Sequence, residues 1–258
     1  MPYQNIQLET LERMAIMTIN RPDKRNALNQ KTRDEILQCL DDLQSTEIRV
    51  VIVTGAGDKA FIAGADIAEF EGRTALTQRD VMKRRRIFDA VEEFPKPVIA
   101  MINGFCLGGG LEFAMACDIR IAADSAKLGQ PEINLGIIPG YAGSQRLSRL
   151  VGKGVALDLL LTGRQIKADE ALAIGLVNRV VPAAELMTAA KAVANELASK
   201  APIAMRYIIE AVNRGLEIPF ESAQIHEATL FGLVASTADM REGTRAFLEK
   251  RKAQFKGE

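Results

Sequence analysis

Residues 97 to 118 read PVIAMINGFCLGGGLEFAMACD, and they carry the clearest structural pattern in the chain. The first part, Pro97 to Ile102, is a short apolar run that predicts a buried strand. The residues from about Gly109 to Cys117 predict a short helix, and three consecutive glycines, Gly108 to Gly110, lie where that helix starts. The stretch therefore predicts a strand, a tight glycine turn and a helix, as in an α/β protein.

The flanking sequence continues this alternation of strands and helices. Arg49 to Thr54 is a run rich in β-branched residues, typical of a strand buried on both faces, and Asp118 to Ala122 predicts a further strand. Asn29 is placed to cap a helix whose apolar residues recur at helical spacing. Nearer the start, residues 6–8 and 15–19 predict a β-hairpin.

After about residue 183 the pattern becomes wholly helical. Segments with an apolar stripe begin near Ala183, Pro202, Pro219 and Ala238, and proline suits the first turn of a helix. We expect an α/β body at residues 1–195, which holds the functional site, and a helical region at residues 196–258. The apolar stripes suit either the core of a monomer or an oligomer interface.

Composition excludes several classes of function. The chain has 258 residues, and its 33 Lys and Arg balance its 33 Asp and Glu. Zero net charge argues against a general nucleic-acid binder, which needs a basic excess to displace counterions. His226 is the only histidine, so chemistry that needs two histidines is excluded, and three scattered cysteines without a CxxC motif predict neither a disulfide framework nor a metal site.

Hydropathy predicts a protein outside the membrane. The polar amino terminus does not resemble a signal peptide. The most apolar window, Val98 to Cys117, contains Asn103, four glycines and Glu112, which would leave polar groups unpaired in lipid. We therefore expect a soluble cytoplasmic protein with neither a membrane nor a nucleic acid as its partner.

Two carboxylates stand alone in apolar surroundings. Glu112 is the only charged residue between Pro97 and Asp118, and Glu132 is the only one between Lys127 and Arg146. Burial raises the pKa of a carboxyl group, and a raised pKa is what a general acid or base near neutral pH requires. The alternative is that each glutamate points to solvent or accepts hydrogen bonds from backbone amides.

The glycine turn before Glu112 offers backbone donors. Glycines at a helix start let the backbone approach a ligand closely and leave amide N–H groups unpaired. A second turn of small residues, Ala63 to Asp66, comes after the predicted strand Arg49 to Thr54 and after Phe61. Two such turns could place two N–H groups around one oxygen atom, which is an oxyanion hole. The alternative is a tight turn packed on a neighbouring strand.

Other motifs are weaker. Gly55-Ala56-Gly57 follows a strand like a degenerate dinucleotide fingerprint, but the residues after it interrupt the helix that this motif requires. Basic residues cluster at residues 21–25 and again at residues 250–252. Either cluster would suit a phosphate-bearing substrate, and the alternative for both is a solvated charge run.

These motifs together resemble the crotonase superfamily, the enoyl-CoA hydratase/isomerase family. The resemblance runs in order through Asn20-Arg21-Pro22, Asn26-Ala27-Leu28, Phe61 to Ile67, Asn103-Gly104, Gly108 to Glu112, Gln130-Pro131-Glu132, Pro139-Gly140, Gln145-Arg146-Leu147, Leu161-Thr162-Gly163 and Phe247 to Lys252. It implies an α/β spiral of ββα units, followed by a helical carboxy-terminal trimerisation region. It also implies a homotrimer, or a homohexamer built as a dimer of trimers.

The resemblance also implies a role for each matching residue. The amides of Ala65 and Gly109 match the oxyanion hole that grips the thioester carbonyl of an acyl-CoA, and Glu112 and Glu132 match the two catalytic glutamates of the hydratases. The residues that match CoA contacts are Lys24, Arg25, Ala27, Ala63, Asp66 and Ile67, with Phe247 and Lys250 reaching the CoA of a neighbouring subunit. Two departures are Ala68, where some relatives carry Lys, and Tyr141, where a small residue is common.

The reaction that the resemblance implies needs no cofactor beyond the coenzyme A of the substrate. We expect reversible syn addition of water to a trans-2-enoyl-CoA, with Glu112 activating the water and Glu132 protonating C2. The first alternative is a Δ3,Δ2-enoyl-CoA isomerase or another acyl-CoA enzyme of the same family, since an isomerase needs one carboxylate only. A non-catalytic RNA-binding or scaffolding relative is the second, and a nicotinamide dehydrogenase is a distant third.

Overall fold

A computed structural model describes residues 3–258, the side chain of Met82 excepted. Its main sheet has six strands in the order β1-β2-β3-β5-β7-β10, and β1 is antiparallel to β2 while the others run parallel. The strands are β1 (Ile6–Leu11), β2 (Met14–Ile19), β3 (Val50–Gly55), β5 (Val98–Ile102), β7 (Ile119–Ala123) and β10 (Arg179–Val181). The predicted hairpin and the three other predicted strands are confirmed.

A second, smaller sheet completes the body. It has the order β4-β6-β8-β9, formed by β4 (Ala60–Ile62), β6 (Phe105–Leu107), β8 (Lys127–Gly129) and β9 (Ile166–Lys167). Each long strand β3, β5 and β7 is followed by one of these short strands and then by a helical segment, so the unit ββα repeats along the chain. This repeat confirms the ββα spiral.

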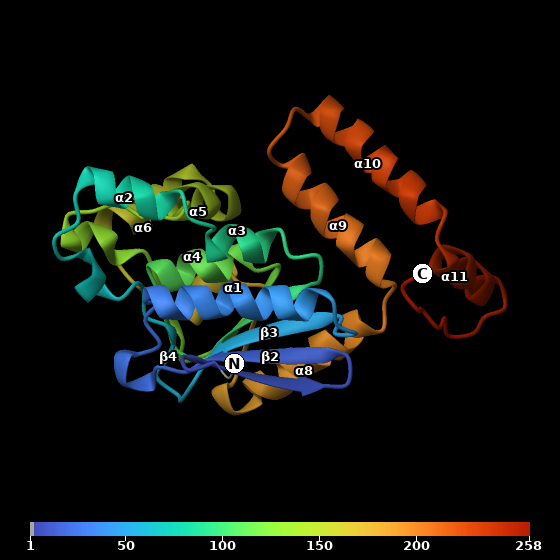
Figure 1. The fold of residues 1–258 in the computed structure, drawn as a ribbon, viewed down its shortest axis with the longest axis horizontal. Helices are drawn as coiled ribbons and strands as arrows, with labels where there is room; N and C mark the ends of the chain where they lie inside the picture. Colours follow the sequence, from blue (N-terminus) through green and yellow to red (C-terminus); the bar gives the residue numbers. More distant parts are fainter. Residues whose placement is uncertain (1–2) are drawn as a thin grey trace.

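The main sheet is covered on both faces (Figure 1). Along its strands, side chains alternate between the two faces. Ile16, Ile52 and Ile99 pack against α8 (Leu186–Ala198), and Met17 and Val53 belong to the core on the opposite face. That face carries α1 (Gln30–Gln44), α3 (Ile87–Glu92) and α4 (Gly109–Ala116). The Asn29 side chain accepts from Thr32 N at 2.9 Å, so the predicted cap of α1 is confirmed.

Among the described residues, the body contains four more helices besides α1, α3, α4 and α8. They are α2 (Ala75–Met82), α5 (Gly143–Val151), α6 (Lys153–Thr162) and α7 (Ala168–Ala173), with short 3-10 turns η1 (Pro22–Lys24), η2 (Ile67–Phe70), η3 (Pro131–Leu135) and η4 (Ala183–Glu185). No helix within residues 3–258 is long and apolar enough to cross a membrane. The cytoplasmic location stays a prediction.

Three helices at the carboxy-terminal end project from the body (Figure 1). They are α9 (Pro202–Gly215), α10 (Phe220–Ala235) and α11 (Ala238–Leu248), and α9 and α10 form an antiparallel hairpin. The helix starts predicted near residues 183, 202, 219 and 238 are confirmed. The predicted domain boundary at residue 195/196 falls in the last turns of α8 and stays a prediction.

Candidate active site

A cavity of about 730 Å³ opens between the glycine turn, η2, α2 and η3. Both isolated glutamates, Glu112 and Glu132, line it. Its other walls are mostly apolar, which suits a ligand with a hydrocarbon part. The lining side chains that supply this character are Ile67, Phe70, Leu135, Ile137, Ile138 and Tyr141.

The glycine turn allows α4 to begin at the cavity. Gly108 precedes the helix with φ of 51°, a left-handed conformation that favours glycine. A Cβ atom on Gly110 would lie 2.0 Å from the carbonyl oxygen of Ile62, so only glycine lets α4 pack this closely on β4. The turn therefore places the first amides of α4 and the Glu112 side chain, one helical turn later, at the same cavity.

Two backbone N–H groups meet at this turn. A Cβ atom on Gly109 would lie 3.4 Å from Ala65 N, so the two residues are neighbours in space. Ala65 is held by pairing with Leu28, whose N–H donates to Gly64 O at 2.9 Å and whose carbonyl accepts from Asp66 N at 3.0 Å. In this extended pairing the N–H of Ala65 points to the other side, toward Gly109.

Neither of these amides has a protein acceptor within residues 3–258. The N–H of Gly109 opens α4 and so has no intrahelical partner, and the helix dipole adds partial positive charge there. A pair of converging, unused N–H donors at a helix start is the arrangement that binds a developing oxyanion. The structure thus brings together the two residues to which the family resemblance assigns this role.

Glu112 is almost completely buried, with 2% of its surface exposed. Its Oε1 accepts from Tyr141 N at 2.7 Å and from Gly143 N at 2.9 Å. Burial raises the pKa of Glu112, while the two N–H donors and the charge of Arg146 act in the opposite direction. The carboxylate is therefore held in one orientation and has a pKa above that of an ordinary glutamate.

Glu132 lies across the glycine turn from Glu112. A Cβ atom on Gly108 would lie 3.1 Å from Glu132 Oε1, and one on Gly109 would lie 4.0 Å from Glu112 Oε2, so both carboxylates approach the same turn. Burial, aided by the negative charge of Glu112, raises the pKa of Glu132 to about 7. Half-protonated near neutral pH, this carboxyl can donate or accept a proton.

Gln130 supports Glu132 from the same segment. With its amide nitrogen turned toward Glu132, it donates to the two carboxylate oxygens at 2.7 and 3.0 Å. The two glutamates are therefore oriented by different means, Glu112 by backbone amides and Glu132 by a side-chain amide.

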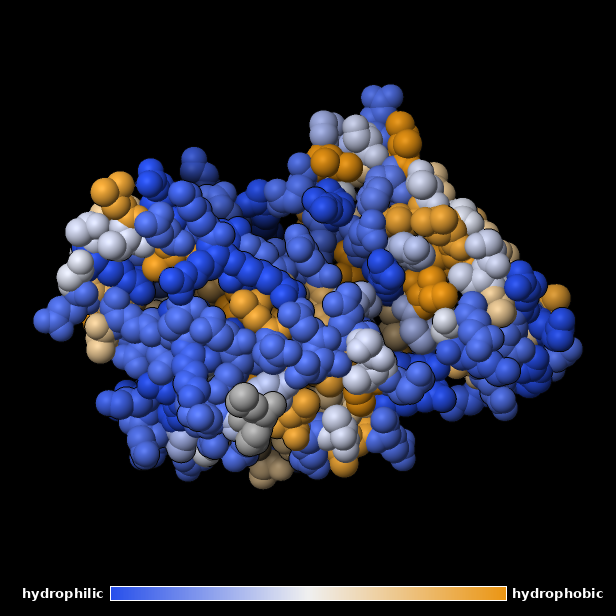
Figure 2. All heavy atoms as spheres, in the orientation of Figure 1, coloured by the Kyte–Doolittle hydropathy of each residue, from blue (hydrophilic) through white to orange (hydrophobic). Residues whose placement is uncertain are grey.

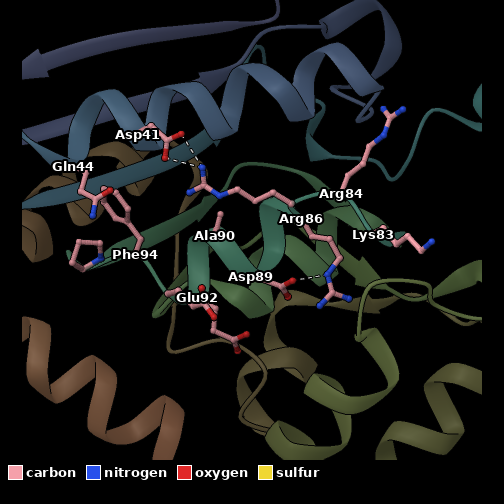
Figure 3. Close-up of a pocket in the computed structure, with 12 residues that line it drawn as sticks. Asp41, Gln44, Lys83, Arg84, Arg86, Asp89, Ala90, Glu92 and Phe94 are labelled. Atoms are coloured by element: carbon pink, nitrogen blue, oxygen red, sulfur yellow. Dashed lines mark hydrogen bonds and ion pairs between the residues drawn. The ribbon is translucent and has the colours of Figure 1, made fainter. Parts of the chain in front are cut away.

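A second hollow, about 870 Å³ in volume, lies between α1 and α3 (Figure 3). It is the larger of the two, but its lining is mostly charged, and several of these side chains pair with one another. Arg85 binds both oxygens of Asp41 at 2.8 Å, and Arg86 donates to Asp89 at 2.5 Å. Neither Glu112 nor Glu132 lines it. We therefore place the chemistry in the smaller cavity.

Most residues nominated for coenzyme A binding gather at one edge of the cavity. Ala63 N donates to Arg25 O at 3.1 Å, which ties the turn at residues 63–66 to the basic loop at residues 22–28. Asp66 forms an ion pair with Arg21 at 3.0 Å. Lys24 and Ala27 lie in that loop, and Ile67 is exposed at the start of η2. Their roles as coenzyme A contacts stay predictions.

Phe247 and Lys250 lie apart from the other predicted coenzyme A contacts. They lie in and just after α11, at the opposite end of the molecule from α2 and η2 (Figure 1). The Phe247 side chain is 83% exposed. Within one chain these two residues do not reach the cavity, and their predicted contact with a neighbouring subunit's ligand is untested.

The loop that holds Glu112 was not among the residues predicted to support the site. Tyr141 and Gly143 donate through backbone N–H groups, which every residue except proline carries, so these bonds cannot be identified from residue type. A Cβ atom on Gly143 would lie 2.8 Å from Glu112 Oε1, so glycine is required there for the carboxylate to fit. The one available clue was the run of small residues around Tyr141, directly before a helix.

Comparisons with known proteins agree with this geometry. A family model described as Enoyl-CoA hydratase/isomerase matches residues 9–258. The short-chain-enoyl-CoA hydratase of Clostridium acetobutylicum is 47% identical over 256 residues, covering 98% of each chain. The crotonyl-CoA hydratase of Syntrophomonas wolfei is 48% identical and covers 99% of each chain. The crystal structure of an enoyl-CoA hydratase from Bacillus anthracis is 43% identical, with a TM-score of 0.94 over 99% of this chain and 100% of that one.

Proposed function

The chain belongs to the enoyl-CoA hydratase/isomerase family, and on this basis we propose that it is an enoyl-CoA hydratase, a hydro-lyase that adds water reversibly to trans-2-enoyl-CoA thioesters and yields 3-hydroxyacyl-CoA. The observation that carries this proposal is the meeting of two buried carboxylates and two unused backbone N–H groups at one glycine turn. Hydration of a conjugated thioester needs both kinds of group.

The N–H groups of Ala65 and Gly109 bind the thioester oxygen. Attack of water on C3 moves negative charge onto that oxygen as an enolate forms, and the fixed donors stabilise this charge more than they stabilise the ground state. Losing one such donor typically costs about 2.7–4 kcal/mol of transition-state stabilisation. When substrate fills the cavity, it displaces the bulk water between the apolar walls, which strengthens these interactions.

The two glutamates move the protons. Glu112, ionised and held by Tyr141 and Gly143, orients the attacking water and removes its proton. Glu132, with a pKa of about 7, is protonated often enough near neutral pH to deliver a proton to C2 on the same face. During hydration Glu112 thus gains one proton and Glu132 loses one. In the reverse reaction Glu132 removes the proton from C2 and Glu112 returns a proton to the leaving water.

The test is turnover of crotonyl-CoA by the purified protein. We expect the conjugated double bond to disappear and 3-hydroxybutyryl-CoA to accumulate until the reaction reaches equilibrium. A parallel assay with 3-butenoyl-CoA addresses the isomerase alternative, which needs a single proton-shuttling carboxylate. Rapid conversion of 3-butenoyl-CoA with negligible hydration of crotonyl-CoA would favour the isomerase and overturn the proposal.

We also propose that the chain assembles as a homotrimer or as a hexamer of two trimers. The α9–α10 hairpin exposes a large apolar surface (Figure 2), and apolar patches of this extent mark interfaces. Its exposed apolar side chains include Ile208, Val212, Leu216, Phe220, Ile225 and Phe231. Light scattering of the wild type and of Phe231→Asp tests this: we expect a trimer or hexamer that the substitution weakens, and a monomeric wild type would contradict it.

A further inference from the structure

The orientation of Glu112 depends on one loop. Both donors to its Oε1, the N–H groups of Tyr141 and Gly143, lie in the segment that runs from the end of η3 to Gly143, the first residue of α5. Ala142 within it has φ of 65°, a left-handed conformation that is unusual for alanine. Whatever fixes the loop therefore fixes the Glu112 carboxylate.

Arg146, in the first turn of α5, holds that loop from behind. Its Nη1 donates to Tyr141 O at 3.0 Å. Its Nε and Nη2 donate to the two carboxylate oxygens of Glu92 at 3.3 and 2.6 Å. The side chain is 11% exposed, and a bidentate Arg–carboxylate pair in such a place has a fixed geometry. One guanidinium thus joins α3 to the peptide that follows Tyr141.

Glu92 continues this connection to the carboxy-terminal helices. It is the last residue of α3 and appears at the rim of the second hollow in Figure 3. Its carbonyl oxygen accepts from Asn213 Nδ2 on α9 at 2.8 Å. A continuous chain of hydrogen bonds and covalent links therefore runs from Asn213 through Glu92, Arg146 and Tyr141 to Glu112.

We propose that Arg146 is a positioning residue for Glu112, and that Asn213 couples this position to the docking of the α9–α10 hairpin on the body. The inference rests on the proposed function for its effect on turnover, although the positioning itself exists without substrate. Through this coupling, the orientation of the Glu112 carboxylate depends on α9 and α10, the helices proposed to form the subunit interface.

Charge contributes a second effect at the same site. The charged groups that face Glu112 are Glu132 of η3 and Arg146 of α5, with Glu92 and Asp89 of α3 behind the guanidinium. The positive charge of Arg146 favours the ionised form of Glu112, so its removal raises the Glu112 pKa further. A role confined to folding would not move this pKa.

Arg149 provides a matched control on the same helix. It forms an exposed ion pair with Glu217, just beyond α9, at 3.4 Å, and it bonds its own helix at Gln145 instead of the loop at Tyr141. For Arg146→Lys we expect kcat for crotonyl-CoA to fall roughly 10- to 100-fold with KM unchanged, because a misplacement of about 1 Å can cost about 100-fold. Arg149→Lys should match the wild type. Equal losses in the two variants would overturn the proposal.

The pH profile separates positioning from general damage. In Arg146→Gln the acidic limb of kcat/KM should move to higher pH, because the base Glu112 then has a higher pKa. A profile lowered evenly at all pH values, with the limb unmoved, would mean that Arg146 is only structural.

Hydrogen exchange tests the coupling without any turnover. In Arg146→Lys and in Asn213→Ala, the amides of Tyr141 and Gly143 should exchange faster than in the wild type, and in Arg149→Lys they should not. Unchanged exchange in Asn213→Ala would refute the link to α9, and unchanged exchange in Arg146→Lys would refute the positioning role. A wild type that fails to hydrate crotonyl-CoA would instead refute the proposed function, so the two failures are distinguishable.

Discussion

Replacing Glu132 by Gln should abolish most activity and, at the same time, stabilise the protein above neutral pH. Burial raises the pKa of Glu132 from 4.5 to about 7. Because one unit of difference between the folded and unfolded pKa is worth about 1.36 kcal/mol, the folded protein loses at most about 3.4 kcal/mol through this group. Glu132 faces an open cavity where solvent screens its charge, so we expect about 1–2 kcal/mol.

Proton binding sets the sign of this effect. Well below pH 4.5 the carboxyl is protonated in both folded and unfolded chains, so its titration adds no difference in stability between wild type and Glu132→Gln. Between pH 4.5 and about 7 the folded state holds its proton while the unfolded state releases it, so rising pH favours unfolding of the wild type. The glutamine side chain does not titrate, and Glu132→Gln therefore lacks this loss.

The assay is urea unfolding of both proteins from about pH 5 to pH 9 at one fixed protein concentration, because assembly also affects stability. The difference between them should open as pH rises and level off above about pH 8. Glu185→Gln, at an exposed position outside any ion pair of the described residues, is the control and should show no such divergence. Parallel curves for wild type and Glu132→Gln across this range would refute the reasoning.

Three further predictions concern activity. A plot of kcat/KM for hydration against pH should be bell-shaped, with its alkaline limb near the pKa of Glu132, about 7. Dehydration should give the same shape, because both directions need the state in which Glu112 and Glu132 together hold one proton. Gly109→Ala places a Cβ atom 3.4 Å from Ala65 N in the proposed oxyanion hole, so kcat should fall by about 100- to 1,000-fold, while circular dichroism should show that the fold is retained. Tyr141→Ala removes a ring stacked on Phe88 at 4.6 Å, and the preference among short- and medium-chain enoyl-CoAs should move toward longer chains.

The long elements of the fold could be predicted from the sequence because their causes are local. The β-branched run at Val50–Gly55 and the capping residue Asn29 each reveal their structure within a few positions. The short strands β4, β6, β8 and β9 could not be predicted. Phe105 of β6 pairs with Ala60 on one side and with Lys127 on the other, so each strand exists because of partners far away along the chain.

The site divides in the same way. Glu112 and Glu132 could be predicted as a pair because isolated charges in apolar segments are costly and conspicuous. The glycine turn could be predicted as a donor site because glycine itself marks a close backbone approach. The groups that orient Glu112 could not be predicted. They are backbone amides in another segment and Arg146, whose partner Glu92 is 54 residues away along the chain.

The central claim is that two glutamates carry out the hydration together, and the single variants Glu112→Gln and Glu132→Gln test it most directly when assayed with crotonyl-CoA beside the double variant. Each single substitution should lower kcat by roughly 100- to 10,000-fold, the usual contribution of a positioned general acid or base. The double variant should be scarcely worse than the poorer single variant, because groups that act as a unit are not additive. Hydration by either single variant at the wild-type rate would contradict the account.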